Sequence, residues 1–263
     1  MDTDSHPSGA GQPAGSAASG GPDAPGGPSA AGGPGVAGDP GVAGGPGVAG
    51  GLGGPGLAGV AGDPGLGEGM LAPDPVAQFS GWLAEAAAAG LPEPNAMVLS
   101  TVTGSGRPRA RSVLLKSHGH DGFVFYTNRT SAKAQDLSGN PWASLLFPWY
   151  ALRRQVIIQG AVSPLSEDES EPYFHSRPHG SQLGAWASRQ SSVIGSRAVL
   201  DERYARLEQR WPEDTVVPMP SFWGGYRLRH DIVEFWQGRA NRLHDRLRYR
   251  RQGTHWVVER LAP

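Results

Sequence analysis

Apolar positions recur along residues 72–263 with two spacings, first helical and then alternating. Asp74 and Pro75 predict the start of a helix, because an aspartate caps a helix well and proline is tolerated in its first turn. The apolar side chains that follow lie three or four positions apart: Val76, Phe79, Trp82, Leu83 and Ala86. This spacing is typical of a helix with one face packed on a core.

Beyond residue 95 the pattern changes to short β-branched and aromatic runs separated by glycine-containing turns. Such runs predict antiparallel strands joined by hairpins. Strands are expected over residues 96–103, 112–116, 123–127, 144–147, 155–162, 222–236, 247–251 and 256–260, and helices over 131–137, 166–174, 181–188 and 197–211. Strands and helices do not alternate regularly, which disfavours a doubly wound parallel sheet. The expected fold class is mainly β with peripheral helices, arranged as an antiparallel barrel.

Composition divides the chain near residue 71. Residues 1–70 hold most of the 40 glycines and contain no aromatic, lysine or arginine side chain. Such a segment buries too little apolar surface to offset the entropy that ordering would cost. The predicted organisation is a disordered Gly/Ala/Pro-rich tail over residues 1–71, followed by one folded domain over residues 72–263.

Within the tail, glycine falls at every third position across residues 32–67, which is the repeat of a collagen triple helix. The run is short, so a disordered low-complexity segment is the favoured interpretation. A triple helix would give a polyproline-like circular dichroism band that melts cooperatively in the isolated tail.

Charge and composition exclude several classes of protein. The chain has no cysteine, which rules out disulfides and thiolate catalysis, and no apolar run long enough to span a membrane. The first residues lack the basic and apolar regions of a secretory signal, so a cytoplasmic location is expected. The net charge of −1 includes an acidic tail, and the moderately basic remainder suits a phosphorylated small ligand better than nucleic acid. No metal site is predicted, because Pro178 would interrupt a helix that carried His175 and His179.

Lysine is rare in this chain. Only two of the 23 basic residues are lysines, Lys116 and Lys133, and each is a candidate for a role that needs a compact ammonium group. Both lie in a series of runs that resembles the pyridoxamine 5′-phosphate oxidase family from about residue 72 to the C-terminus. The matching runs are 111–116, 125–128, 145–149, 154–156, 173–178, 181–186, 190–192, 222–225, 234–238, 242–246 and 260–263.

This resemblance implies an FMN-binding split β-barrel that forms a homodimer with FMN at the subunit interface. The implied reaction is the oxidation of pyridoxamine and pyridoxine 5′-phosphate by O2 to pyridoxal 5′-phosphate, with release of H2O2. FMN is the implied cofactor, and neither a metal nor a membrane takes part.

The resemblance also implies the site residues, with Arg111 and Lys133 on the FMN phosphate. The FMN set is Arg111, Ser112, Val113, Leu114, Leu115, Lys116, Tyr126, Thr127, Lys133, Gln155, Gln190, Ser191, Trp236 and Arg246. The substrate set is Lys116, Tyr173, Arg177, Ser181, Arg242, Leu243 and His244, of which the first four would bind the substrate phosphate. Arg242 and His244 are the expected catalytic residues. If residues 242–244 form a strand, alternation places both polar side chains on one face.

Three departures from the family pattern affect these expectations. Ala132 stands where members often carry an arginine of the phosphate-binding turn, and Arg129 is a candidate substitute. His179 and Gly180 replace a common Arg-Asp pair, and no Arg-Arg-x-Tyr segment precedes the first helix. Two alternatives therefore remain open: a flavin or pyridoxal-phosphate carrier without turnover, and a related split-barrel reductase that uses a deazaflavin.

Overall fold

The computed structural model of the chain describes residues 65–263. Most of the predicted tail, including residues 32–64 of its glycine repeat, lies outside the described residues. The helical elements are η1 (Glu68–Met70), α1 (Pro75–Ala88), α2 (Ala132–Gly139), η2 (Tyr150–Leu152), α3 (Glu167–Ser176), α4 (His179–Ala187), α5 (Arg197–Arg210) and η3 (Ala240–Arg242). The strands are β1 (Ala96–Val102), β2 (Pro108–Leu114), β3 (Ser117–Gly119), β4 (Gly122–Asn128), β5 (Trp142–Trp149), β6 (Arg154–Pro164), β7 (Trp223–Gln237), β8 (Asp245–Gln252) and β9 (His255–Arg260). No helix in this part of the chain has the length and apolar character needed to cross a membrane.

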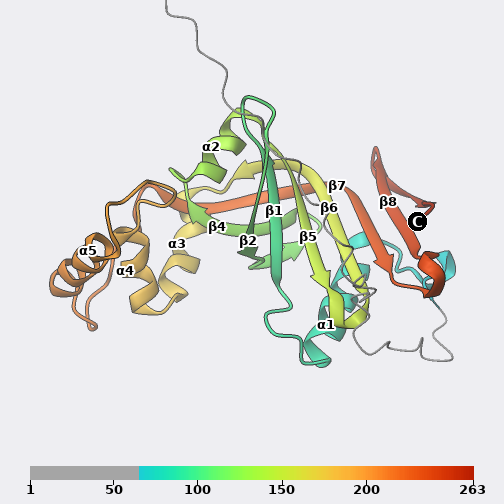
Figure 1. The fold of residues 1–263 in the computed structure, drawn as a ribbon, viewed down its shortest axis with the longest axis horizontal. Coiled ribbons are helices and arrows are strands. Elements are labelled where there is room, and N and C mark those ends of the chain that lie inside the picture. The colour runs from blue at the N-terminus through green and yellow to red at the C-terminus, as the bar shows by residue number, and fades with distance from the viewer. Residues whose placement is uncertain (1–64) are drawn as a thin grey trace, which may run out of the picture. The chain divides into compact units, whose positions relative to one another are not determined.

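All the strands belong to one curled antiparallel sheet (Figure 1). Its order is β2-β1-β5-β6-β7-β4-β3, and β8 adds to β7 and carries β9. The long strand β7 pairs with β4 through residues 223–228 and with β8 through residues 232–237. One strand therefore joins two halves of the sheet, and the predicted fold class, a mainly β split barrel with peripheral helices, is confirmed.

Helix α1 covers the apolar interior of the curled sheet, as its periodicity predicts. Asp74 caps it, and its Oδ1 accepts hydrogen bonds from the backbone N–H groups of Val76 and Ala77 at 2.9 and 3.0 Å. Phe79 is fully buried and meets Phe123 and Phe147 edge to face at 5.0 and 4.8 Å between ring centroids. The helix thus anchors the sheet on which the site is built.

Residues 65–71 belong to the folded domain, although their composition placed them in the predicted tail. Leu66 is 6% exposed and packs in the main core, and its backbone N–H donates to Asp245 Oδ2 at 3.0 Å. Arg260 holds both oxygens of Glu68 at 2.7 and 3.0 Å. The partners of this segment come from the C-terminal strands, so its local composition does not reveal its packing.

This packing predicts a stability effect. We expect Leu66→Ala to lower the free energy of unfolding by roughly 2–4 kcal/mol, because it removes a buried side chain and leaves a cavity. Met70→Ala is the matched control, since Met70 is 54% exposed and should change stability little. Urea denaturation of both variants measures the difference; equal and small losses would show that the segment does not pack in solution.

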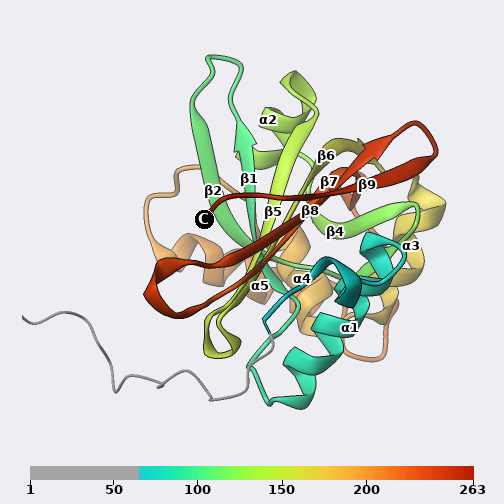
Figure 2. The same cartoon turned by 90° about the vertical axis from the view of Figure 1, so that its right-hand side faces the viewer.

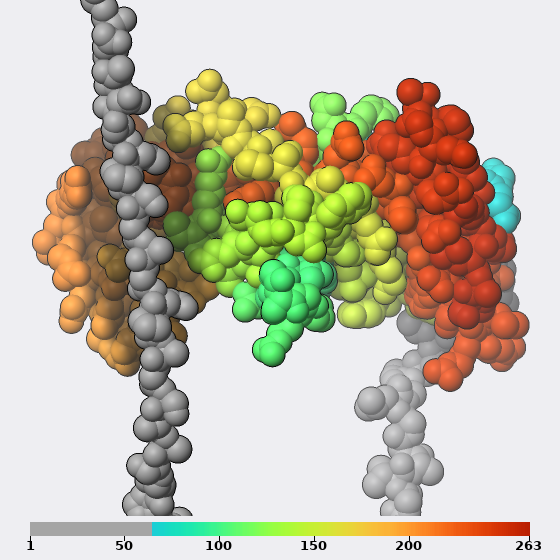
Figure 3. Space-filling view, turned by 90° about the horizontal axis from the view of Figure 1, so that it is seen from above, coloured from blue at the N-terminus to red at the C-terminus, as the bar shows by residue number. Residues whose placement is uncertain are grey.

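The two ends of the domain are built differently. Helices α3, α4 and α5 lie at one end, and strands β8 and β9 form the other (Figures 1 and 3). Figure 2 shows the β8–β9 hairpin from its own side. A smaller apolar cluster at the helical end contains Phe174, Leu183, Val217 and Trp223. Because β7 has 15 residues, its two ends are separated by roughly 45 Å along the strand.

The expected strand over residues 242–244 is wrong. Residues 240–242 form the 3-10 turn η3, and β8 begins only at Asp245. Asn241 and Arg242 take positive φ values of 55° and 62°, which reverse the chain between β7 and β8. The strand alternation that was to place Arg242 and His244 on one face therefore does not apply.

Candidate active site

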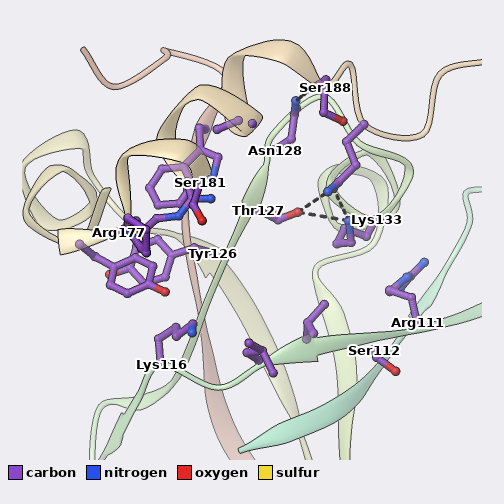
Figure 4. Close-up of a pocket in the computed structure, with 18 residues that line it drawn as sticks. Arg111, Ser112, Lys116, Tyr126, Thr127, Asn128, Lys133, Arg177, Ser181 and Ser188 are labelled. Atoms are coloured by element: carbon purple, nitrogen blue, oxygen red, sulfur yellow. Dashed lines mark hydrogen bonds between the residues drawn. The ribbon is translucent and has the colours of Figure 1, made fainter. Parts of the chain in front are cut away.

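A cavity of about 640 Å³ opens beside the helical end of the domain (Figure 4). Its walls come from β2, β4, the start of α2, the α3–α4 corner, the segment after α4 and the first residue of β7. The lining includes twelve of the predicted site residues: Arg111, Ser112, Val113, Leu114, Lys116, Tyr126, Thr127, Lys133, Tyr173, Arg177, Ser181 and Gln190. None of the lining residues carries a carboxylate, so the cavity is cationic and suited to an anionic ligand.

Lys133 and Arg111 form the first of two clusters of cationic side chains in the cavity. Lys133 is 8% exposed, and its Nζ donates to Thr127 Oγ1 at 3.1 Å, Ser131 Oγ at 3.3 Å and Gln190 Oε1 at 2.5 Å. Burial, together with the charge of Arg111, lowers the pKa of Lys133 from 10.5 to about 8. All three partners are neutral, so an incoming anion would meet an ammonium group that no carboxylate neutralises.

Arg111 is the other member of this cluster and lies on β2. Its Nη1 donates to Thr101 Oγ1 at 2.7 Å and to the carbonyl oxygen of Leu99 at 3.2 Å. Its Nη2 lies 3.5 Å from Asp136, a buried carboxylate that also pairs with Arg109 at 3.2 Å. Burial lowers the pKa of Arg111, and Asp136 partly restores it. Asp136 thus fixes the guanidinium from outside the cavity.

A second cationic group lies across the cavity, where Figure 4 shows Lys116, Arg177 and Ser181. Arg177 Nη1 is buried and has no hydrogen-bond partner among the described residues. Burial lowers the pKa of this guanidinium. A buried donor left unpaired costs free energy, and a bound phosphate oxygen would satisfy it. The two groups together suit a ligand pair that carries two phosphates.

The predicted substitute for the missing arginine at position 132 does not reach the cavity. Arg129 Nη2 donates to the carbonyl oxygen of Leu165 at 2.7 Å. Its guanidinium fills the space beside Gly224, where a Cβ atom would lie only 2.4 Å from Nη2. Arg129 is therefore turned toward β7, and Lys133 and Arg111 are left as the cations at this end of the cavity.

Six of the predicted residues gather elsewhere, around the end of β7 that is opposite Trp223. Gln155 pairs with Trp236 across β6 and β7, and Trp236 pairs with Arg246 across β7 and β8. The His244 ring lies 4.6 Å from the Trp236 ring, and its Nδ1 accepts a hydrogen bond from the Arg239 backbone N–H at 3.0 Å. Arg242 and Leu243 are exposed on the adjoining turn. We call Gln155, Trp236, Arg242, Leu243, His244 and Arg246 the distal cluster.

The two remaining predictions have different surroundings. Leu115 is 4% exposed and packs in the main core rather than lining the cavity. Ser191 lies at the rim, where its Oγ accepts a hydrogen bond from the Ala132 backbone N–H at 3.2 Å. The lining also includes residues that received no role from the sequence: Asn128, Pro178, Gly184, Ala185, Ser188 and Trp223. All of these except Ser188 stood in the matching runs, which was the available signal.

Two family models match the chain over most of the described residues. The model described as "Pyridoxamine 5'-phosphate oxidase" matches residues 83–211. The model described as "Pyridoxine 5'-phosphate oxidase C-terminal dimerisation region" matches residues 223–263, which contain every member of the distal cluster except Gln155.

Curated relatives and solved structures agree with these matches. A pyridoxine/pyridoxamine 5′-phosphate oxidase from Frankia alni is 60% identical over 192 residues, covering 72% of this chain and 80% of the relative. One from Salinispora arenicola is 56% identical over 199 residues, covering 75% and 90%. Among solved structures, PhzG from Burkholderia lata 383 in complex with tetrahydrophenazine-1-carboxylic acid is 34% identical with a TM-score of 0.69, covering 73% of this chain and 94% of PhzG. An FMN-binding protein from Nostoc punctiforme shares the fold, with a TM-score of 0.58 at 18% identity, and the match covers 70% of this chain and 97% of that protein.

Proposed function

The chain belongs to the pyridoxamine 5′-phosphate oxidase family, and we propose that it oxidises pyridoxamine and pyridoxine 5′-phosphate to pyridoxal 5′-phosphate with FMN and O2. The observation that carries this proposal is the cavity with two cationic groups and no lining carboxylate. FMN and the substrate each carry one phosphate. The cations Lys133 and Arg111 could bind one of these phosphates, and Arg177 and Lys116 could bind the other. The family resemblance inferred from the sequence is confirmed.

FMN fits the end of the cavity that holds Lys133. Lys133 and Arg111 would bind its phosphate through charge-assisted hydrogen bonds. Thr127 and Gln190 accept hydrogen bonds from the Lys133 ammonium group and would hold it in place beside the phosphate. Ser112, Tyr126 and Ser191 are the neutral groups available to the rest of the cofactor, together with the backbone of β2. This assignment follows the sequence expectation for the residues that line the cavity or its rim.

The substrate phosphate fits the opposite group. Arg177 and Lys116 supply charge, while the hydroxyl groups of Tyr173 and Ser181 orient the phosphate. The unpartnered Nη1 of Arg177 supports this role, because a phosphate oxygen would complete its hydrogen bonding. The vitamin ring would then extend from this group toward the FMN end.

We propose that the distal cluster of a second subunit completes each site. In one chain these residues lie at the opposite end of β7 from Trp223, so they do not line the same chain's cavity. The match of residues 223–263 to a dimerisation region supports a homodimer in which one subunit supplies the cavity and its partner the distal cluster. A two-fold arrangement then forms two equivalent sites.

The chain's own residues would place the substrate and stabilise charge at its C4′ substituent. When bound, FMN would accept a hydride from C4′. Arg242 is exposed on its turn and offers a permanent positive charge to the amine or hydroxyl group. His244 accepts a hydrogen bond at Nδ1, which leaves Nε2 as the nitrogen that donates in the neutral ring.

Oxygen uptake tests the proposed function. The purified protein should be yellow and should consume O2 when pyridoxamine or pyridoxine 5′-phosphate is added, with pyridoxal 5′-phosphate as product. A yellow protein without oxygen uptake would indicate a carrier. A colourless protein that refuses micromolar FMN would contradict the cofactor assignment.

The lowered pKa of Lys133 predicts that FMN binding weakens at alkaline pH. Below pH 8 the Lys133 side chain is a charged ammonium group that can bind phosphate. Above pH 8 the side chain is mostly neutral in the apoprotein, so Lys133 must take up a proton when the phosphate binds, which weakens binding. We expect the FMN dissociation constant to rise by up to roughly tenfold between pH 8 and pH 9. Fluorescence titration at pH 7, 8 and 9 measures it, and Lys133→Met should remove most of the dependence. An affinity that is the same at pH 7 and pH 9 would contradict the role of Lys133.

A further inference from the structure

Three nearly parallel aromatic rings in the cavity wall form one compact group, which we call the stack, and a cation lies over each of two of its rings. Trp223 and Tyr126 lie 5.3 Å apart between centroids at 12°, and Tyr126 and Tyr173 lie 4.1 Å apart at 27°. The Arg177 guanidinium carbon lies 5.0 Å from the Trp223 centroid. The Lys116 Nζ lies 5.6 Å from the Tyr173 centroid. Tyr173 and Trp223 also lie 6.2 Å apart at 15°, so the three centroids form a triangle, with Arg177 over the Trp223 ring and Lys116 over the Tyr173 ring.

The rings hold both cations without neutralising them. No salt bridge among the described residues involves Lys116 or Arg177, and the cavity lining contains no carboxylate. Burial raises the pKa of Tyr126, with smaller contributions from Tyr173 and from the carboxylate of Glu169. Glu169 itself forms a salt bridge with Arg227 at 3.1 Å. A carboxylate partner would compete with an incoming phosphate, whereas an aromatic face attracts a cation and leaves its N–H groups available.

The backbone leaves room for this stack. Gly225 lies opposite Tyr126 in the β4–β7 pairing. A Cβ atom at Gly225 would lie 2.9 Å from Tyr126 Cε1 and 2.5 Å from a Leu165 methyl carbon. Trp223 is 6% exposed and also meets Phe174 edge to face at 5.1 Å, so its ring is fixed from behind. The stack is thus a rigid part of the wall.

We propose that Trp223 is a positioning residue for Arg177, and that its ring holds the guanidinium where it can bind the substrate phosphate. This inference rests on the proposed function, because it concerns how the same site recognises its substrate. Trp223 acts through Arg177 and does not itself take part in the reaction. Removal of the ring should therefore weaken phosphate recognition and leave the chemical step largely intact.

Steady-state kinetics of the FMN-loaded enzyme test this role. Trp223→Leu should raise KM for pyridoxamine 5′-phosphate roughly 5- to 30-fold, with a much smaller change in kcat and unchanged FMN binding. Trp223→Phe keeps an aromatic face and should recover most of the affinity. Trp211→Leu is the matched control, because Trp211 holds Arg210 at 4.7 Å outside the cavity and should leave KM unchanged.

A double-mutant cycle separates positioning from a general structural effect. If Trp223 acts through Arg177, then Trp223→Leu should add little to the KM increase of Arg177→Ala. Independent, multiplying effects of the two substitutions would overturn the proposal. An unchanged KM in Trp223→Leu, or an equal loss for unphosphorylated pyridoxamine, would also overturn it. If Trp223→Leu does not fold, the double-mutant cycle is measured with Trp223→Phe and Arg177→Ala instead. The KM increase of Trp223→Phe is smaller, and it should again disappear when Arg177 is replaced by alanine.

Binding of inorganic phosphate distinguishes failure of this inference from failure of the proposed function. A wild-type enzyme that does not oxidise either substrate would contradict the proposed function. The dissociation constant of inorganic phosphate would still test the stack, because it should rise several-fold in Trp223→Leu and stay constant in Trp211→Leu. An equal affinity of the wild type and Trp223→Leu for inorganic phosphate would overturn the role of Trp223 in either case.

Discussion

Arg242→Ala should lower kcat by roughly 100- to 1000-fold while the protein keeps its FMN. The size follows from the loss of a preorganised charge aimed at the reacting group, which typically costs a factor of this order. Arg242 is exposed on the turn after β7 and lies outside the cavity that would hold the FMN phosphate. Its removal should therefore leave cofactor affinity nearly unchanged, and stopped-flow measurement of flavin reduction separates the two effects.

Arg197→Ala provides the control for this substitution. Arg197 pairs with Asp201 on the exposed helix α5 and lines no part of the cavity. Its loss should change neither flavin reduction nor cofactor content. Flavin reduction at the wild-type rate in Arg242→Ala would show that Arg242 has no part in the reaction.

Lys133→Met should weaken FMN binding by roughly 10- to 100-fold. The substitution removes a buried ammonium group that has only neutral partners, and hydrogen bonds to charged groups contribute about 1.5–3 kcal/mol each. Methionine has a similar length, so the apoprotein should remain folded. Titration of the apoprotein with FMN, followed by flavin fluorescence, measures the loss.

Gln135→Met tests whether the loss belongs to the cavity or to helix α2 in general. Gln135 lies on the same helix but is exposed, and its side chain donates a hydrogen bond to the Thr130 carbonyl oxygen. FMN affinity should be unchanged in this variant. Equal affinities of Lys133→Met and wild type would remove Lys133 from the phosphate site.

Local sequence signals predicted the elements well. The Asp74 cap, the helix expected over residues 166–174 and the strand periodicities all correspond to observed elements, because each depends on neighbours within a few residues. The turn at residues 240–242 was missed because it does not depend on such local signals. Positive φ values at Asn241 and Arg242 arise from closure of the β7–β8 hairpin and leave no mark in the hydrophobic pattern.

The grouping of the site residues depended on pairing that the sequence does not show. The resemblance supplied one set of candidates, whereas the structure divides it into a cavity and a distal cluster at opposite ends of β7. Gln155, Trp236 and Arg246 form a row only because β6, β7 and β8 pair in this register. The sequence made Arg129 a candidate substitute for the missing cation. In the structure its guanidinium occupies the space beside Gly224 and therefore points away from the cavity. Non-local contacts thus decide which candidates meet.

Co-expression of Arg177→Ala and Arg242→Ala subunits tests most directly whether two chains share each site. Each homodimer should be nearly inactive toward pyridoxamine 5′-phosphate at a concentration near the wild-type KM. In the purified mixed dimer, one site combines both substitutions and the other combines an intact cavity with an intact distal cluster. We predict about half of the wild-type oxygen uptake per mixed dimer, since one of two equivalent sites is restored. A mixed dimer no more active than the two homodimers would contradict the shared site.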